Sequence, residues 1–233
     1  MGNLIADIFV TVKDRYALAT RSLLSLLDNT DRSQFRLTVC VDGAFKHSED
    51  DYAEPSKLGD MQELRFVLER NADYVLHSRA NEGLGPTINR AVAQIKSIND
   101  WNSDMRACQP ELIAPFIVMC QDDLLYSRNW LPTLASRFIA FETKHSLGFA
   151  SGVECIEHKV RQDLGGGMVL KDWIRAAQML GRREYWESLM PISRFDPETG
   201  RVRAKPNDGM GSGVDWWLIR NHENSVCRTG RTC

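Results

Sequence analysis

The sequence predicts an α/β fold in which a mostly parallel, Rossmann-like sheet carries helices on both faces. Short apolar runs rich in β-branched residues predict four buried strands, at residues 8–12, 37–41, 74–77 and 116–120. The segments that follow these strands predict four helices, at 17–27, 61–69, 86–98 and 131–141. Alternation of strand and helix repeated in this way is typical of a parallel sheet that is covered on both sides.

The individual elements carry their own signals. The leucines of residues 17–27 form an apolar stripe at helical spacing, and Pro86 is tolerated in a first helical turn. The polar segments 46–56 and 99–109 predict loops. In the rest of the chain we expect a smaller, mixed portion with short strands at 148–151 and 168–170, helices at 173–180 and 214–221, and a mobile loop or lid across 186–212.

Length and composition indicate one globular domain. The chain has 233 residues, a formal net charge of −2 and a pI near 6.2, which give no whole-chain argument for a polyanionic partner. No stretch approaches the roughly 20 apolar residues of a membrane-spanning helix. The first residues also lack the pattern of a signal peptide, so we expect a cytoplasmic protein without a transmembrane segment. The six cysteines contain no CxxC pair, which disfavours a zinc site.

An acidic pair stands at the end of the fourth expected strand. Gln121-Asp122-Asp123 directly follows the apolar run 116–120. Adjacent carboxylates repel each other and lose hydration when they are buried, so their place at a strand end calls for a compensating charge. A hard divalent cation, which prefers oxygen ligands and often bridges carboxylates to phosphates, would supply that charge. The alternative is a helix N-cap ahead of the helix expected near Trp130.

Polar residues follow all four expected strands, in the segments 11–15, 42–43, 79–83 and 121–123. Parallel strands end on one edge of a sheet, so these segments are expected to converge on one crevice, where open α/β sheets bind ligands. No G-x-G-x-x-G follows the first strand, which argues against a dinucleotide-binding Rossmann enzyme. Taken alone, Asp42-Gly43 would be a turn pair, and its case for a binding role rests on the other three strand ends.

In their order along the chain, these segments resemble the inverting glycosyltransferases of the GT-A fold, in particular the large family 2 typified by cellulose, chitin and hyaluronan synthases. The most specific match is Asn81-Glu82-Gly83-Leu84-Gly85 followed by Asn89-Arg90-Ala91. The resemblance implies a single GT-A-like domain with a nucleotide-sugar-binding half at 1–125 and an acceptor-side half at 126–233. It also implies a set of residues that contact the nucleotide, among which Asp42 would contact a uracil base. These residues are Thr11, Arg15, Asp42, Arg79, Asn81, Gly83 and Asp122.

The resemblance also implies a metal site. Asp123 would hold Mn²⁺ or Mg²⁺ on the diphosphate, with Asp122 placed for the ribose or the metal. Gln121 occupies the first position of the family's DxD segment, which departs from a three-acid pattern. Many relatives supply a metal-ligating histidine downstream, and the only histidine after Asp215 is His222. Either the site has fewer protein ligands here, or the chain lacks a C-terminal portion.

The sugar and acceptor side is implied by two later segments. The glycine run that includes Gly166 and Gly167 resembles the strand beside the donor sugar. Residues 213–218 resemble the segment that carries the catalytic base, which would be Asp215, with Trp216 as a platform for the acceptor. The residues alone also allow a structural interpretation of each segment. The glycines would then form a tight loop, Asp215 would cap a helix, and Trp216 would pack in the core.

The implied activity is that of a metal-dependent, inverting hexosyltransferase. It would move a sugar from a nucleotide sugar, expected to be a UDP-sugar, to an acceptor hydroxyl. One alternative is a sugar-nucleotide nucleotidyltransferase, although such enzymes usually carry a Gly-rich loop after the first strand that this chain lacks. Another is a non-catalytic nucleotide or carbohydrate-binding module, because fold does not fix function. The acceptor stays open among a saccharide, a lipid-linked sugar, a protein and a nucleic-acid base.

Overall fold

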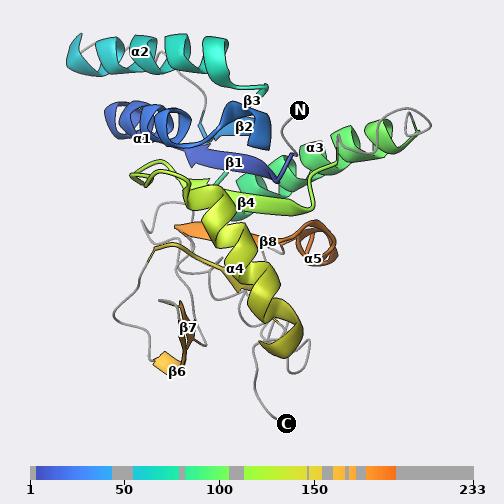
Figure 1. Cartoon of the computed structure of the whole chain (residues 1–233). Coiled ribbons are helices and arrows are strands. Elements are labelled where there is room, and N and C mark those ends of the chain that lie inside the picture. The colour runs from blue at the N-terminus through green and yellow to red at the C-terminus, as the bar shows by residue number, and fades with distance from the viewer. Residues whose placement is uncertain are drawn as a thin grey trace, which may run out of the picture.

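A six-stranded sheet forms the centre of the molecule. The computed structural model describes residues 4–43, 55–78, 82–104, 113–145, 147–153, 160–165, 168–171 and 177–192. The strand order is β3-β2-β1-β4-β8-β5, and Figure 1 labels the strands from β3 to β8 in this order. The first four of these are mutually parallel, and β8 is antiparallel to both of its neighbours. The strands are β1 Ala6–Val12, β2 Phe35–Val41, β3 Tyr74–His77, β4 Phe116–Gln121, β5 Phe149–Ala150 and β8 Gln178–Arg182.

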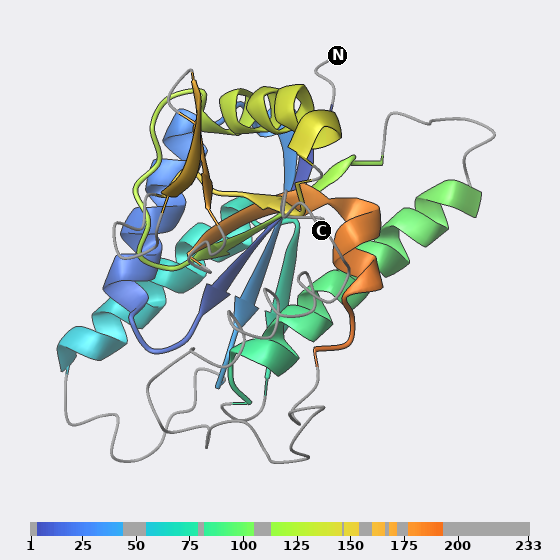
Figure 2. The same cartoon turned by 90° about the horizontal axis from the view of Figure 1, so that it is seen from below.

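Helices cover both faces of this sheet, as Figure 2 shows from below. One face carries α1 Tyr16–Asn29, α2 Pro55–Asn71 and α4 Trp130–His145. The other face carries α3 Leu84–Asp104 and α5 Arg183–Ser188. A short 3-10 helix, η1 Arg32–Gln34, leads into β2, and a separate antiparallel hairpin joins β6 Val160–Gly165 to β7 Met168–Lys171. Among the helices of the described ranges, none combines the length and the apolar character that crossing a membrane requires.

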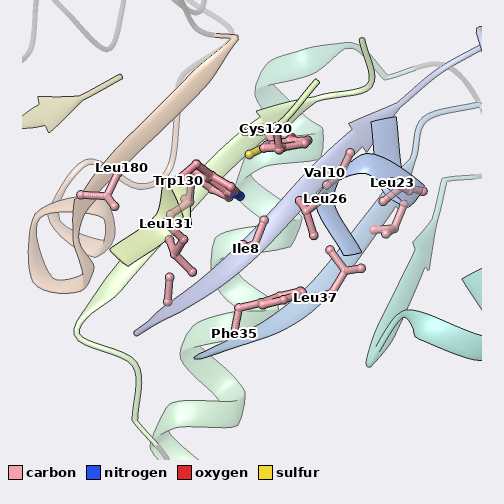
Figure 3. Close-up of a cluster of buried hydrophobic side chains, with 14 of the residues drawn as sticks. Ile8, Val10, Leu23, Leu26, Phe35, Leu37, Cys120, Trp130, Leu131 and Leu180 are labelled. Atoms are coloured by element: carbon pink, nitrogen blue, oxygen red, sulfur yellow. The ribbon is translucent and has the colours of Figure 1, made fainter. Parts of the chain in front are cut away.

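The core follows from strands that are buried on both sides. Ile8 and Val10 of β1 point to the cluster under α1, α2 and α4 (Figure 3). Phe9, between them, points to the opposite cluster and meets Trp186 edge to face, with ring centroids 5.8 Å apart. Because successive side chains of a strand alternate between faces, a strand covered on both faces is apolar at nearly every position. This explains why the unbroken apolar runs predicted strands correctly.

The sequence was right about the parallel half and partly wrong about its edges. All four expected parallel strands form, and a helix follows each of them. The helix expected at 173–180 is wrong at its described end, because Gln178–Arg182 is β8, whose Met179 and Leu180 pair with β4. A short apolar run does not distinguish a helix from a buried strand, and here the free edge of β4 decides for the strand.

Parts of three expected loops are helical, and residues 55–56 of the first one, 46–56, already belong to α2. Residues 99–104 continue α3 instead of forming a loop. Residues 186–188, placed in the expected loop or lid, belong to α5, and Trp186 is fully buried. In the last two segments a residue, Asn99 or Trp186, has a buried partner far away in the sequence. Local composition carried no sign of those contacts.

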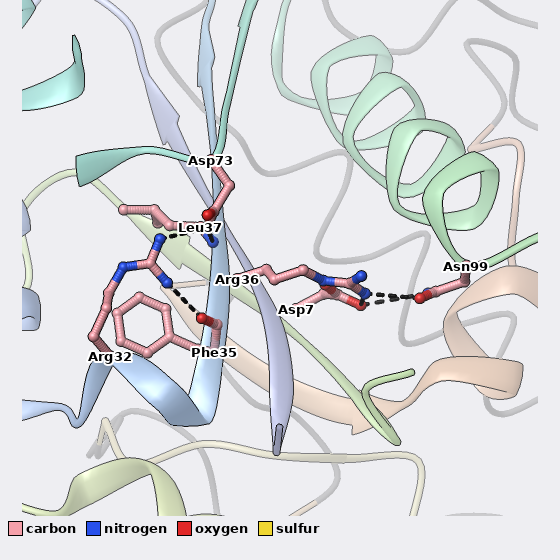
Figure 4. Close-up of polar contacts among 7 residues, drawn as sticks. All are labelled: Asp7, Arg32, Phe35, Arg36, Leu37, Asp73 and Asn99. Carbon is pink, nitrogen blue, oxygen red and sulfur yellow. Dashed lines mark hydrogen bonds and ion pairs between the residues drawn. The ribbon is translucent and has the colours of Figure 1, made fainter. Parts of the chain in front are cut away.

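Ion pairs and hydrogen bonds stabilise the edge of the sheet where the parallel strands begin (Figure 4). Asp7 of β1 accepts two hydrogen bonds from Arg36 of β2, at 2.6 and 2.8 Å. Asn99 of α3 accepts a third bond from Arg36, at 2.7 Å. Burial raises the pKa of Asp7 above its ordinary value, and the bonds from Arg36 oppose that rise. Asp73, on the same edge, accepts from Arg32 at 2.5 Å and from the Leu37 amide at 2.7 Å.

The packing of α4 gives a matched pair of stability variants. Phe138 is fully buried and meets Phe116 edge to face at 5.6 Å, whereas the adjacent Ile139 is about half exposed. Phe138→Ala leaves a cavity in the core and is expected to cost about 3–5 kcal/mol of unfolding free energy. Ile139→Ala should cost about 0.5 kcal/mol or less. Denaturant unfolding of both variants measures the difference, and equal losses would contradict this assignment of the core.

Candidate functional site

The candidate site lies where the strand order of the sheet reverses. β1 lies between β2 on one side and β4 on the other, so the chain winds outwards in both directions from the β1–β4 pair. In open α/β sheets, ligands bind outside the carboxyl ends of the strands at such a switch point. Residues 13–15 leave the end of β1 and residues 122–123 leave the end of β4. The segments that the sequence singled out after these two strands therefore meet at this point.

Arg15 bridges the two carboxylates of the acidic pair. One terminal nitrogen donates to Asp123 Oδ2 at 2.8 Å, and the other donates to Asp122 Oδ1. The side chain of Asp122 is 3% exposed, whereas those of Asp123 and Arg15 are 37% and 46% exposed. Burial raises the pKa of Asp122 above its ordinary value, and the charge of Arg15 opposes that rise. The pair thus offers one buried and one solvent-facing carboxylate around a single cationic group.

Helix α1 holds the loop that carries this pair. Polar groups along one side of α1, and Thr30 directly after it, accept hydrogen bonds from residues 124–130, and the partners follow the same order along both segments. The pairs are Leu124 N to Ser22 Oγ at 3.3 Å, Tyr126 N to Ser25 Oγ at 3.0 Å, Asn129 N to Asn29 O at 3.2 Å and Trp130 Nε1 to Thr30 Oγ1 at 2.8 Å. The helix that follows Arg15 therefore fixes the position of Asp122 and Asp123 as well.

Asp42 joins the end of β2 to the start of α3. One carboxylate oxygen accepts from the Glu82 amide at 2.8 Å and from the Ser78 hydroxyl at 3.0 Å. The other oxygen accepts from the Gly83 amide at 2.9 Å. Gly83 has a φ of +87°, a left-handed conformation that favours glycine. Three of the roughly four lone-pair positions of this carboxylate are thus used inside the protein. Asp42 acts as a turn residue here, and a contact with a base stays a prediction.

We call the edge of the sheet where the parallel strands end the rim. The other predicted residues lie either at this rim or outside the described ranges. Thr11 lies near the end of β1, in register with Cys40 of β2 and Gln121 of β4. Gly83 directly precedes α3. Six predicted site residues lie outside the described ranges: Arg79, Asn81, Gly166, Gly167, Asp215 and Trp216. The described strand ends that the sequence expected to converge do lie on one edge of the sheet.

Some contacts at this rim were not anticipated from the sequence. Ser22 and Ser25 position the acidic loop, and their signal was their spacing of three residues, which places both hydroxyls on one side of α1. Asn89 of α3 exchanges two hydrogen bonds with the backbone of Ile192, at 2.7 and 3.0 Å. No local pattern predicts that pairing, because it joins residues 103 positions apart.

The acidic pair has the donor atoms that a divalent cation needs. The Arg15 guanidinium already occupies a position between one oxygen of Asp122 and one of Asp123, so both carboxylates can face a common cation. Within the ranges that the structure describes, no group of three or more His, Cys, Asp or Glu side chains gathers. Two carboxylates suit a magnesium-type site in which phosphate oxygens and water complete the coordination.

Comparisons with known proteins identify the fold. No protein-family model matches the sequence, and no curated protein does. Among solved structures, S. aureus TarS matches with a TM-score of 0.50 and 11% identity, over 92% of this chain and 33% of that chain. The mannosyltransferase PcManGT from Pyrobaculum calidifontis, solved in complex with GDP-Man and Mn²⁺, matches with a TM-score of 0.49 and 13% identity, over 79% of this chain and 46% of that one.

The chain therefore spans about a third of the length of TarS and about half of that of the mannosyltransferase. Its fold is the GT-A fold of glycosyltransferases, which confirms the fold expected from the strand-end segments. The likeness to TarS covers 92% of this chain. At 11% identity it establishes the architecture of the chain and leaves its chemistry to the residues at the rim.

The Asp42 network gives a test of the rim that needs no ligand. Asp42→Ala leaves the Glu82 and Gly83 amides without their acceptor, which should lower the unfolding free energy by about 1–3 kcal/mol. Hydrogen exchange at these two amides should become faster than in the wild type, because the turn loses its anchor. Asp28→Ala, at an exposed position on α1, is the control. Unchanged exchange at both amides of the Asp42 variant would contradict the proposed anchor.

Proposed function

We propose that the protein is a metal-dependent, inverting glycosyltransferase that uses a nucleotide sugar, with UDP-sugars as the expected donors. One observation carries the proposal: in a GT-A fold, an acidic pair and an arginine meet at the switch point between β1 and β4. A nucleotide sugar brings a diphosphate that leaves with negative charge. Carboxylates that hold a cation, together with a guanidinium, are the groups that stabilise such a leaving group.

In this proposal, different residues of the rim bind different parts of the donor. Asp123, the more exposed carboxylate, would hold the metal on the diphosphate, and the more buried Asp122 would contact the ribose or the metal. A divalent cation at this pair supplies Lewis-acid stabilisation of the charge on the β-phosphate. Arg15 provides a planar pair of donors that suits phosphate oxygens. Each of these side chains comes from a segment that the sheet and α1 hold in place.

The nucleoside end belongs to the neighbouring strands β1, β2 and β3. Thr11 lies at the centre of this rim, and Asp42 has about one lone-pair position left for a base N–H after its bonds to the turn. Arg79, Asn81 and Gly83 complete the nucleotide contacts in the proposal. A uracil, whose N3 carries a hydrogen, suits an acceptor of this kind. Thymine and guanine carry a comparable ring N–H, so the choice of uridine rests on the family resemblance of the segment that contains Asp42.

The acceptor side lies in the second half of the chain. Asp215 is the proposed general base, which takes the proton of the acceptor hydroxyl as that oxygen attacks the anomeric carbon and the nucleoside diphosphate leaves from the opposite face. Gly166 and Gly167 allow close approach of the backbone to the donor sugar, and Trp216 offers a ring for stacking. The proposed acceptors are a saccharide, a lipid-linked sugar, a protein or a nucleic-acid base.

Thermal shift with a panel of nucleotides tests the donor and metal assignments together. Uridine diphosphate with Mn²⁺ should stabilise the wild type, because a ligand that binds only the folded state raises the melting temperature. Asp123→Asn should lose the Mn²⁺-dependent part of this shift and should also lose hydrolysis of the UDP-sugar. Asp28→Asn, which removes an exposed carboxylate from α1, should keep both.

The panel also contains the outcomes that contradict the proposal. Guanosine, cytidine and thymidine diphosphates serve as matched ligands, so a larger shift with one of them would replace the uridine assignment. No shift with any nucleoside diphosphate, with or without Mn²⁺, would contradict a nucleotide-sugar enzyme and favour another use of the fold. A shift that Asp123→Asn leaves unchanged would remove the metal from the acidic pair.

The proposed base is tested by separating chemistry from binding. Asp215→Asn keeps the shape of the side chain and removes its basicity, so kcat should fall about 10²–10⁴-fold. Binding of UDP with Mn²⁺, measured by calorimetry, should stay at the wild-type level because the base acts on the acceptor. A variant that loses donor affinity as well, or that keeps full kcat, would show that Asp215 has another role.

A further inference from the structure

Arg15 occupies the place that the proposed function gives to a divalent cation. Its two terminal nitrogens bind one oxygen of Asp122 and one of Asp123, so it satisfies the acidic pair from within the protein. A guanidinium fork matches carboxylate oxygens closely and stays protonated at every working pH. In the free protein the acidic pair therefore already has its counter-ion. A metal ion that comes to the same oxygens has to take them from Arg15.

The burial of the three side chains shows which bonds can be exchanged. Asp122 is almost fully buried, so a nearby positive charge stabilises its ionised form in the free and in the loaded protein. Asp123 and Arg15 are exposed enough to reach solvent and an incoming ligand. An ion pair between two exposed side chains contributes little to stability, so the contact between Arg15 and Asp123 is easily broken. Replacing Arg15 by another cation keeps Asp122 neutralised.

The new partner for Arg15 is the anionic group of the donor. Arg15 directly precedes α1, in the segment that leaves β1 at the switch point where a diphosphate would bind. Its donors suit phosphate oxygens as well as carboxylates. A diphosphate and a divalent cation that arrive together therefore offer Arg15 a new acceptor and offer the acidic pair a new cation. Neither ligand alone makes both replacements.

We infer that Arg15 is an internal counter-ion that changes partners when the donor binds. In the free protein it holds Asp122 and Asp123, and in the loaded protein it moves to the diphosphate and leaves both carboxylates to the metal. This inference rests on the proposed function, since it requires a diphosphate and a divalent cation at this rim. Its consequence is positive coupling: the free protein binds the metal weakly, and nucleoside diphosphate and metal strengthen each other's binding by the same factor.

Calorimetric titration with Mn²⁺ alone tests the inference without any turnover. Arg15→Gln frees the acidic pair, so it should bind Mn²⁺ about tenfold more tightly than the wild type in the absence of nucleotide, as expected when a charged hydrogen-bonded competitor is removed. Arg21→Gln makes the same change of charge at an exposed position of α1, the helix that follows Arg15, and should bind Mn²⁺ like the wild type. The double variant with Asp123→Asn should lose the gain.

The second measurement is the coupling between Mn²⁺ and UDP. In the wild type UDP should tighten Mn²⁺ binding, and in Arg15→Gln this coupling factor should be about tenfold smaller, because there is no longer an arginine to release. Arg15→Lys retains the charge but not the planar fork, so its Mn²⁺ affinity and its coupling should lie between the two. It also serves as the informative variant if Arg15→Gln does not fold.

The outcomes separate this inference from the proposed function. Equal or weaker Mn²⁺ binding by Arg15→Gln and by Arg15→Lys, with Mn²⁺ and UDP still binding together to the wild type, would overturn the exchange of partners and leave the proposed function standing. Absence of Mn²⁺ binding from every variant, even with UDP, would overturn the metal site and the inference with it. Tighter Mn²⁺ binding by Arg21→Gln as well would assign the effect to net charge, and this too would overturn the inference.

Discussion

Two neighbouring carboxylates at the end of a strand need a positive charge beside them, and the organisation of this rim depends on that need. Asp122 is almost fully buried next to Asp123, so an uncompensated pair would repel and lose hydration. Arg15 supplies the charge from the end of the adjacent strand. The pairing is available only because β1 and β4 are parallel neighbours, so that both chains leave the sheet at the same edge. The order and direction of the strands therefore also determine which charged side chains meet at the site.

The two edges of the sheet are built differently. Where the strands begin, the carboxylate of Asp7 is buried and bonded to Arg36, and Asn99 seals the same cluster. Breaking such a buried network leaves charged groups without partners, which makes it a permanent part of the fold. Where the strands end, Asp123 and Arg15 remain accessible to solvent, so a ligand can replace their mutual contact. The same kinds of side chain stabilise one edge and leave the other ready for binding.

Much of the fold was predictable because its signals are local. The parallel strands are buried on both faces, so their apolar runs stand out from the surrounding sequence. The segment after β4 was singled out because an acidic pair in such a place has a cost that needs an explanation, and the structure pairs it with Arg15. The strand β8 was missed because its apolar run suits a helix as well as a strand, and only the free edge of β4 selects between them. The continuation of α3 to Asp104 was missed because Asn99 has buried partners on β1 and β2.

The sequence by itself determined which residues stand at the ends of the parallel strands, since the period of the side chains and the positions of the polar residues are written along the chain. It did not determine which partners those residues bind. Only the tertiary structure decided that Asp42 bonds the turn before α3, and that Ser22 and Ser25 hold the acidic loop. Only the tertiary structure, too, decided that Arg15 neutralises Asp122 and Asp123. The physical reason is that a hydrogen bond or an ion pair depends on distances in space, and these partners lie between 40 and 108 residues apart along the chain.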